Sequence, residues 1–146
     1  MTPKEEPPVI KPFNPLDKRN LGESVAKALL AEDVKSLPLV PFIGAGVYVL
    51  YYTGTFSAYA ELSKINNDAR FCCPIYIGKA VPAGARKGGL GLEVEHGQAL
   101  HKRLTEHTES LDAVCNLDVR DFYCRFLVIV NFLCEGGTES SQIARR

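Results

Sequence analysis

Two short apolar runs between Phe42 and Lys79 decide how this chain folds: Gly46-Val47-Tyr48-Val49-Leu50-Tyr51-Tyr52 and Pro74-Ile75-Tyr76-Ile77-Gly78-Lys79. Both are dense in β-branched and aromatic residues and bounded by glycine or proline, which is typical of β-strands. Each run carries a tyrosine close to a glycine. Because side chains alternate along a strand, antiparallel pairing of the two runs can place Tyr48 and Tyr76 side by side on one face.

Length and composition predict one soluble domain. The chain has 146 residues, of which 46% are hydrophobic and 23% charged, and this is ordinary for a globular protein with a core. The formal net charge of zero does not indicate a polyanionic partner, although a local basic patch can still bind one. We expect no membrane segment, since no apolar run approaches the length needed to cross a bilayer.

The cysteines indicate a reducing compartment. Their number is odd and no Cys-x-x-Cys pair occurs, so we expect reduced thiols in a cytoplasmic protein and no zinc site. The five are Cys72, Cys73, Cys115, Cys124 and Cys134.

The N-terminal part of the sequence predicts an extended arm followed by a helix. Prolines crowd the arm, residues 1–19, which is either a loose terminus or an arm that grips a partner subunit or DNA. Asn20 and Glu23 are spaced as a capping box at the start of the helix. The apolar residues at helical spacing predict a stripe that docks on a sheet, and Pro38 ends the helix. They are Val25, Leu29, Leu30 and Val34.

Three segments near the tyrosine runs leave alternatives open. Gly44-Ala45-Gly46 is read as a tight approach into a strand rather than a phosphate cradle, because no third glycine opens a helix after it. Residues 55–73 form an insertion with a short helix. The loop 79–92 is rich in glycine and cations, and its Arg86 and Lys87 are either contacts to DNA phosphates or part of an ordinary solvated loop.

The C-terminal half predicts a second helix, Gln98 to Leu111, and a third strand, Asp121 to Val130, in the middle of the sheet or under a helix. Arg103 and His107 are four residues apart and project from nearly the same helix face. Such a pair can hold a phosphate and move a proton, although on its own it is more often a solvated surface. His96 and His101 are interpreted as surface residues.

With these motifs in view, the sequence resembles the GIY-YIG nuclease superfamily, and more narrowly its small type II restriction endonucleases, which cut a GC-rich palindrome. The resemblance covers Ser36 to Leu127, and the gap between the two tyrosine motifs agrees with an insertion found in these enzymes. The residues that carry it are Gly44-Ala45-Gly46-Val47-Tyr48, Tyr51-Tyr52-Thr53-Gly54, Pro74-Ile75-Tyr76-Ile77-Gly78-Lys79-Ala80-Val81-Pro82-Ala83-Gly84, Arg103-Leu104-Thr105-Glu106-His107, and Asp121-Phe122 through Arg125-Phe126.

The resemblance implies an α+β fold, a small, mainly antiparallel three-stranded sheet flanked by helices, with the nuclease domain over residues 20–130. It also implies catalytic roles. Tyr48 would act as base or orienting group for the attacking water, helped by the charge of Lys79, and Tyr76 would orient the phosphate or nucleophile. Arg103 would neutralise the scissile phosphate, and His107 would hydrogen-bond to Tyr48 or to the phosphate.

A divalent cation, Mg²⁺, is implied at the leaving oxygen. Relatives carry a metal-binding glutamate on a helix after the third strand. In this chain the corresponding tail, 131–146, contains Glu135 and Glu139 but is interrupted by glycines, so neither is assigned as a metal ligand. We interpret the tail as a truncation or an altered reading of a longer gene.

Three functions remain open on the sequence. The first is a homodimeric restriction endonuclease acting on palindromic double-stranded DNA, since such sites match two-fold symmetry. The second is a catalytically dead remnant that still binds DNA. The third is a protein-interaction module in which the tyrosines only pack.

Overall fold

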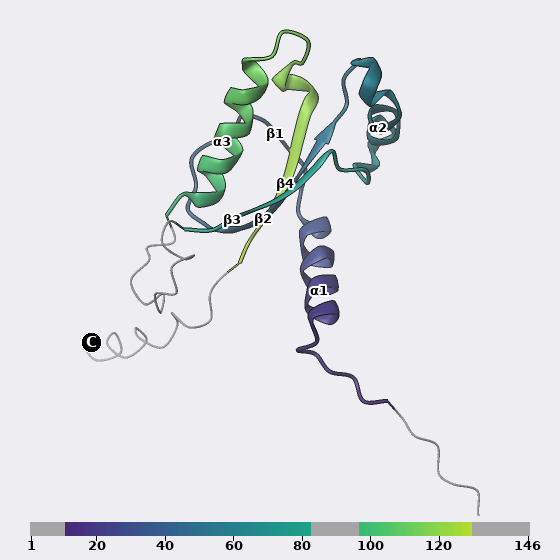
Figure 1. Cartoon of the computed structure of the whole chain (residues 1–146), viewed down its shortest axis with the longest axis vertical. Coiled ribbons are helices and arrows are strands. Elements are labelled where there is room, and N and C mark those ends of the chain that lie inside the picture. The colour runs from purple at the N-terminus through teal and green to yellow at the C-terminus, as the bar shows by residue number, and fades with distance from the viewer. Residues whose placement is uncertain (1–10, 83–96, 130–146) are drawn as a thin grey trace, which may run out of the picture.

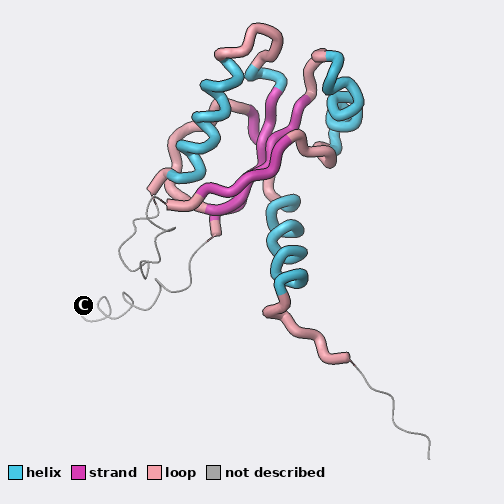
Figure 2. Tube along the Cα trace, viewed as in Figure 1, coloured by secondary structure: helices cyan, strands magenta, loops and turns pink. Residues whose placement is uncertain are grey.

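The computed structural model describes residues 11–82 and 97–129, which form an α+β fold (Figures 1 and 2). None of the helices in these two ranges is long and apolar enough to cross a membrane. The elements are α1 (Lys18–Ala31), β1 (Lys35–Ser36), β2 (Gly46–Tyr52), α2 (Ala60–Ile65), β3 (Tyr76–Ala80), α3 (Ala99–Asp112) and β4 (Phe122–Val128). Short turns flank α2 and precede β4: Ser57–Tyr59, Asn66–Arg70 and Val119–Asp121.

The sheet is antiparallel throughout, with strand order β1-β4-β2-β3. The predicted α+β class is confirmed, with one strand more than expected. The additional strand, β1, is only two residues long and pairs Lys35 with Cys124 at one edge of the sheet. A strand this short carries no periodicity, and therefore no sequence pattern predicts it. The predicted third strand, β4, does lie inside the sheet, between β1 and β2.

Alternate residues of β2 build two apolar layers. On one face, Tyr48, Leu50 and Tyr52 are buried under α3, whose Leu100 and Leu104 are almost completely buried. The helix was predicted within one residue at each end, because its leucines recur at helical spacing. On the other face, Val49 and Tyr51 pack with Leu29, Phe71, Tyr123 and Leu127. Figure 1 shows α3 lying along its face of the sheet.

The described cysteines are free thiols, as expected, and they divide between core and surface. Cys124 on β4 is completely buried in the layer beneath α3. Burial raises the pKa of its thiol to about 11, so this group is a protonated, unreactive part of the core at neutral pH. Cys72 and Cys115 are exposed.

Helix α1 differs from its prediction at both ends: it begins after Asp17, and it ends at Ala31, so that Val34 and Pro38 lie beyond it. Its N-cap is Asp17, whose carboxylate accepts a hydrogen bond from the Arg19 amide at 2.8 Å, and the predicted cap Asn20 lies inside the helix. The stripe also packs less than predicted, since Leu29 is buried but Leu30 is 56% exposed. The reason is visible in Figure 1: α1 extends away from the sheet, so that only its C-terminal end reaches the apolar layer.

Two polar side chains that the sequence did not single out fasten the insertion and α1 to the sheet. The buried Asn66 donates to the carbonyls of Tyr52 and Cys73 at 3.0 and 2.9 Å, and it accepts from the Cys73 amide. Arg125 of β4 donates to the Tyr51 hydroxyl at 2.7 Å and to the carbonyls of Phe71 and Glu32, each at 2.9 Å. These bonds close the base of the insertion and hold the end of α1 in place.

Two glycines are required because the backbone comes close to its neighbours. A Cβ at Gly46 would lie 2.0 Å from the Leu127 carbonyl oxygen, which confirms the tight approach predicted for Gly44-Ala45-Gly46. A Cβ at Gly78 would lie 2.5 Å from both Cζ and the hydroxyl of Tyr48. Tyr48 is fully buried and has no room to retreat, and therefore only glycine fits opposite it.

We predict that Gly78→Ala destabilises the domain by about 1–3 kcal/mol, because the new methyl group overpacks the Tyr48 ring. Urea denaturation followed by circular dichroism measures the change. Gly22→Ala is the matched control, since no heavy atom lies within 4 Å of its added Cβ. This control replaces a glycine inside α1, and its free energy of unfolding should rise by about 0.5–1 kcal/mol. A Gly78→Ala protein as stable as the wild type would contradict the packing argument.

Candidate active site

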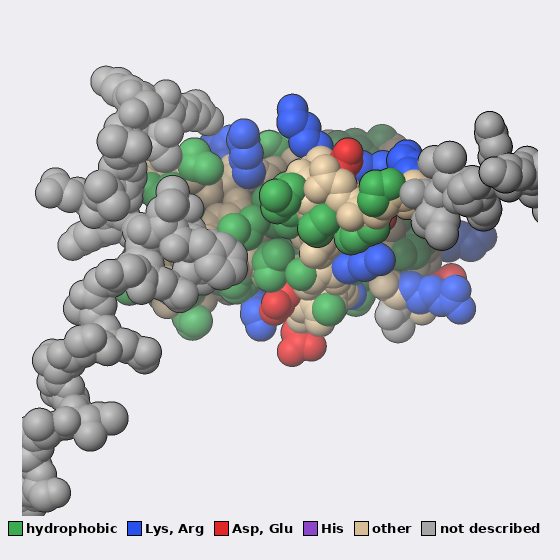
Figure 3. All heavy atoms as spheres, turned by 90° about the horizontal axis from the view of Figure 1, so that it is seen from below, with side chains coloured by type: hydrophobic (Ala, Val, Ile, Leu, Met, Phe, Trp, Pro, Cys, Tyr) green, Lys and Arg blue, Asp and Glu red, His purple; other side chains and the backbone are tan. Residues whose placement is uncertain are grey.

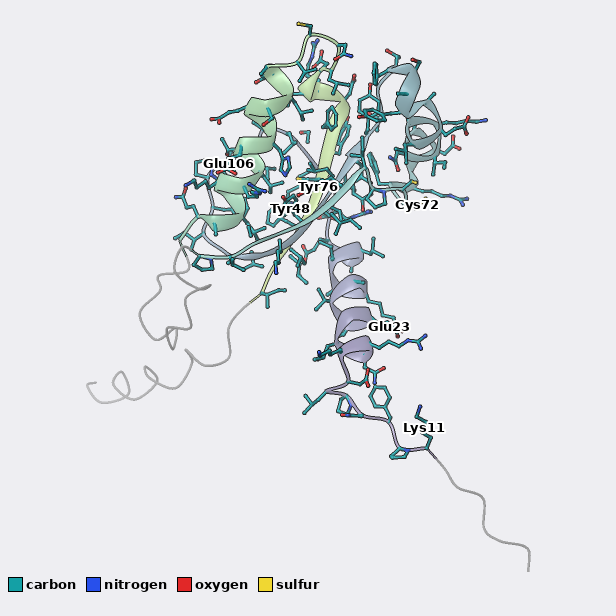
Figure 4. The ribbon with its side chains drawn as sticks, in the orientation of Figure 1. Lys11, Glu23, Tyr48, Cys72, Tyr76 and Glu106 are labelled. Atoms are coloured by element: carbon teal, nitrogen blue, oxygen red, sulfur yellow. The ribbon has the colours of Figure 1, made fainter. Side chains whose placement is uncertain are left out.

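The register of β2 and β3 brings Tyr48 and Tyr76 to the same face. Tyr48 lies opposite Gly78 and Leu50 lies opposite Tyr76, so the two phenols are diagonal neighbours. Their ring centroids are 6.0 Å apart, at an interplanar angle of 26°. Tyr48 is fully buried whereas Tyr76 is 42% exposed, so the first lies inside the cluster and the second at its surface. Figure 4 shows both on the side of the sheet that faces α3.

His107 of α3 completes an aromatic cluster with the two phenols. Its Nε2 atom lies 2.8 Å from the Tyr48 hydroxyl oxygen, within hydrogen-bond distance. Its ring meets Tyr48 and Tyr76 edge-on, with centroid separations of 5.6 and 4.9 Å. The imidazole is partly buried, because α3 packs its leucines against the same sheet face.

Arg103 lies one helical turn before His107 and supplies the positive charge of the site. Its Nη1 atom donates to Oε2 of Glu106 at 2.8 Å, and both side chains are about half exposed, at 49% and 44%. The Glu106 carboxylate first, and then the Tyr48 hydroxyl, raise the pKa of the guanidinium above its ordinary value. The guanidinium is therefore close to both a carboxylate and the phenols.

Burial keeps both partners of the Tyr48–His107 hydrogen bond neutral. It raises the pKa of Tyr48 above 10.0, an effect that Arg103 opposes and Tyr76 reinforces. Burial, and then the charge of Arg103, lower the pKa of His107 below 6.5, while Glu106 opposes them. At pH 7 the pair is thus a phenol and a neutral imidazole. The imidazole tautomer with a bare Nε2 can accept the phenolic proton.

The structure brings together Tyr48, Tyr76, Arg103 and His107, but it does not bring Lys79 to them. Lys79 pairs with Val47, whose side chain belongs to the opposite apolar layer, so the lysine projects from the other face of the sheet. Arg86 and Lys87 lie outside the described residues. Figure 3 shows lysine and arginine side chains spread over the face seen from below, not gathered into one basic patch.

Two residues of α3 were misjudged or missed on sequence. His101 is not a surface residue: it is partly buried, its Nε2 lies 3.2 Å from the Leu39 carbonyl oxygen, and its ring meets Phe42 edge-on. Glu106 was not singled out, although its position three residues after Arg103 is the spacing that favours an ion pair on a helix.

No set of metal ligands is assembled within residues 11–82 and 97–129, where no group of three histidine, cysteine or acidic side chains could hold an ion. The carboxylate at the cluster, Glu106, is engaged by Arg103. Glu135 and Glu139 lie outside the described residues. The described donors therefore do not fit a complete divalent-cation site.

This combination, an antiparallel sheet with paired tyrosines and an arginine and histidine from one covering helix, is that of a GIY-YIG nuclease domain. The family model described as the Eco29kI GIY-YIG domain matches residues 40–145, and the chain belongs to this restriction-endonuclease family. The substrate class of the family is DNA. A search of curated proteins returned no match for this chain.

We predict that the pKa of His107 in the folded protein is below 6.5, and that protonation of this imidazole destabilises the fold in acid. Because its folded-state pKa lies below the unfolded value, its contribution is present above pH 6.5 and is lost as pH falls through the folded pKa. Proton NMR titration, with the resonance assigned by His107→Gln, gives the pKa directly.

The corresponding unfolding experiment compares His107→Gln with wild type between pH 7 and pH 5. The wild type should lose more unfolding free energy over this range than the variant. A His107 resonance that titrates at or above pH 6.5 would refute the prediction.

Proposed function

We propose that the chain is a type II site-specific endonuclease that hydrolyses phosphodiester bonds in double-stranded DNA. The observation that carries the proposal is the 2.8 Å contact between the Tyr48 hydroxyl and His107 Nε2, with Arg103 one turn away on the same helix. Phosphodiester hydrolysis needs a proton acceptor for water and a cation for the developing charge. The cluster supplies both.

The neutral state of Tyr48 determines how it can act. A phenol with a raised pKa is not a ready base by itself, but its oxygen can accept a proton from water while its own proton passes to His107. The charge of Arg103 acts on both groups: it opposes the upward shift of the phenol's pKa, and it lowers the pKa of the imidazole that accepts the proton. Tyr48 is thus proposed as the group that deprotonates water and His107 as the final proton acceptor.

Tyr76 and Arg103 are proposed to bind the scissile phosphate. Tyr76 is 42% exposed and lies at the surface of the cluster, and we propose that its hydroxyl contacts a phosphate oxygen. The structure records a hydrogen bond from Nη1 of Arg103 to Glu106, and the remaining N–H groups of the fork suit a phosphate. The proposal assigns no contact to Lys79, since it projects from the other face of the sheet.

The remaining elements of the proposal come from the family. GIY-YIG nucleases generally use a divalent metal ion, and we propose Mg²⁺. Since the described side chains do not form a ligand set, no residue and no reaction step is assigned to the ion. A homodimer on a palindromic site, and contacts of Arg86 and Lys87 with DNA phosphates, complete the proposal.

Plasmid cleavage tests the central residue. The wild type with Mg²⁺ should give discrete fragments and stop when EDTA removes the metal. Tyr48→Phe should lower the rate by about 10²–10⁴-fold, because it removes the hydroxyl that relays the proton. Tyr123→Phe is the matched control: it removes a phenolic hydroxyl from the opposite face of the sheet and should leave the rate unchanged.

The same experiment separates the other two functions. If neither protein cleaves but both shift DNA in a salt-dependent gel assay, the chain is a DNA-binding remnant. If neither protein cleaves DNA and neither binds it, the protein-interaction module is the remaining function. Cleavage by Tyr48→Phe at the wild-type rate would remove this tyrosine from the mechanism.

Arg103→Ala should reduce cleavage by about 10²–10³-fold, because the transition-state charge loses its cation. Arg103→Lys should recover only part of the rate, since an ammonium keeps the charge but not the planar fork. Arg120→Ala is the control, because this exposed arginine is likewise paired with a nearby carboxylate, Asp118 at 2.6 Å. Single-turnover rates measure all three. If Arg103→Ala cleaved DNA as fast as Arg120→Ala, Arg103 would have no role in stabilising the transition state.

A further inference from the structure

A carboxylate lies beside the arginine that is proposed to bind phosphate. Glu106 Oε2 is 2.8 Å from Arg103 Nη1, on the same stretch of α3. Figure 4 shows Glu106 on the helix next to the two labelled phenols. A negative charge at this place repels the DNA backbone. A carboxylate beside the proposed phosphate site therefore suggests that it has a second, favourable role.

The contact restricts where the guanidinium can point. Arginine has a long side chain with many rotamers, and an exposed one is not held in a single position by packing. Glu106 holds Nη1, and the pair is carried by a 14-residue helix that is anchored by its buried leucines. The other N–H groups of the fork are thereby directed from a fixed point beside the phenols.

We propose that Glu106 is a positioning residue that holds the Arg103 guanidinium beside Tyr48 and Tyr76 and so fixes where the scissile phosphate binds. This inference rests on the proposed nuclease function. It deepens that function by assigning a role to a residue that touches neither the substrate nor the reacting atoms.

Glu106 also acts on the proton acceptor. The groups that face His107 are Tyr48 from β2, Tyr76 from β3, and Arg103 and Glu106 from α3. Arg103 disfavours the imidazolium form and Glu106 favours it, and thus the carboxylate offsets part of the arginine's effect on the pKa of His107. A neutral residue at position 106 would leave the imidazole a weaker base.

Two other readings of the ion pair make opposite predictions. As an ordinary surface pair it would contribute little, and its removal would change nothing at the site. As a competitor for Arg103 it would obstruct the phosphate, and its removal would tighten DNA binding and speed cleavage. The positioning role predicts slower cleavage when the contact is lost and recovery when a neutral acceptor restores it.

The test compares Glu106→Ala, Glu106→Gln and the control Glu109→Gln in single-turnover cleavage with Mg²⁺. Glu109 is exposed on the same helix and forms no ion pair within the described part of the chain. Glu106→Ala should slow cleavage by about 10-fold to 100-fold, the range typical of losing a supporting contact. Glu106→Gln, whose amide oxygen still accepts from Arg103, should regain most of the rate. In the pH–rate profile of Glu106→Gln, the acid limb should lie at lower pH than in the wild type, because the pKa of His107 is lower. Glu109→Gln should match the wild type.

NMR on the free protein tests the same role without catalysis. Glu106→Gln should lower the pKa of His107 and keep the Arg103 Nε–H resonance in place, whereas Glu106→Ala should move that resonance toward its free-arginine position. Wild-type values in both variants, or cleavage by Glu106→Ala that equals or exceeds the wild-type rate, would overturn the inference. If the wild type does not cleave, the proposed function fails, while the NMR result still decides whether Glu106 positions Arg103.

Discussion

The antiparallel register of β2 against β3 is the constraint on which the site depends. It sets Gly78 opposite Tyr48, and the absence of a side chain there gives the phenol ring its space. A slip of one residue would bring a side chain against the ring and turn Tyr76 to the opposite face of the sheet. The close approach of Gly46 to the Leu127 carbonyl holds β2 equally tightly against β4. The backbone register therefore determines where the phenols lie, independently of their polar contacts.

The elements that the sequence predicted well are those whose signal is local. The two tyrosine strands and α3 have apolar residues at the right period, and the four-residue spacing of Arg103 and His107 places both on one helix face. The edge strand β1 could not be predicted, because its two residues owe their conformation to β4. The roles of Asn66 and Arg125 could not be predicted either. Both side chains bond to backbone or side-chain groups that only the folded chain brings near them.

Lys79 lies on the face of the sheet away from the phenols, and the sequence alone could have predicted this placement. Tyr76 and Lys79 are three positions apart in one strand, and an odd separation puts two side chains on opposite faces. The family resemblance drew attention to the lysine as the nearest cation, but strand alternation excludes it from the phenol face. The Asn20 cap failed for a comparable reason: Asp17 stands earlier in the chain and is an equally good capping residue, so the helix begins there.

The electrostatics of the cluster explain why the site would become more basic when it holds its substrate. In the free protein, Arg103 lowers the pKa of His107 and so weakens the proposed proton acceptor. A phosphate bound at the guanidinium brings a negative charge that cancels this effect and favours the imidazolium form. In the proposed reaction, His107 would therefore be the stronger base when a phosphodiester occupies the site. Glu106 provides part of the same compensation in the absence of DNA, because its negative charge also raises the pKa of His107.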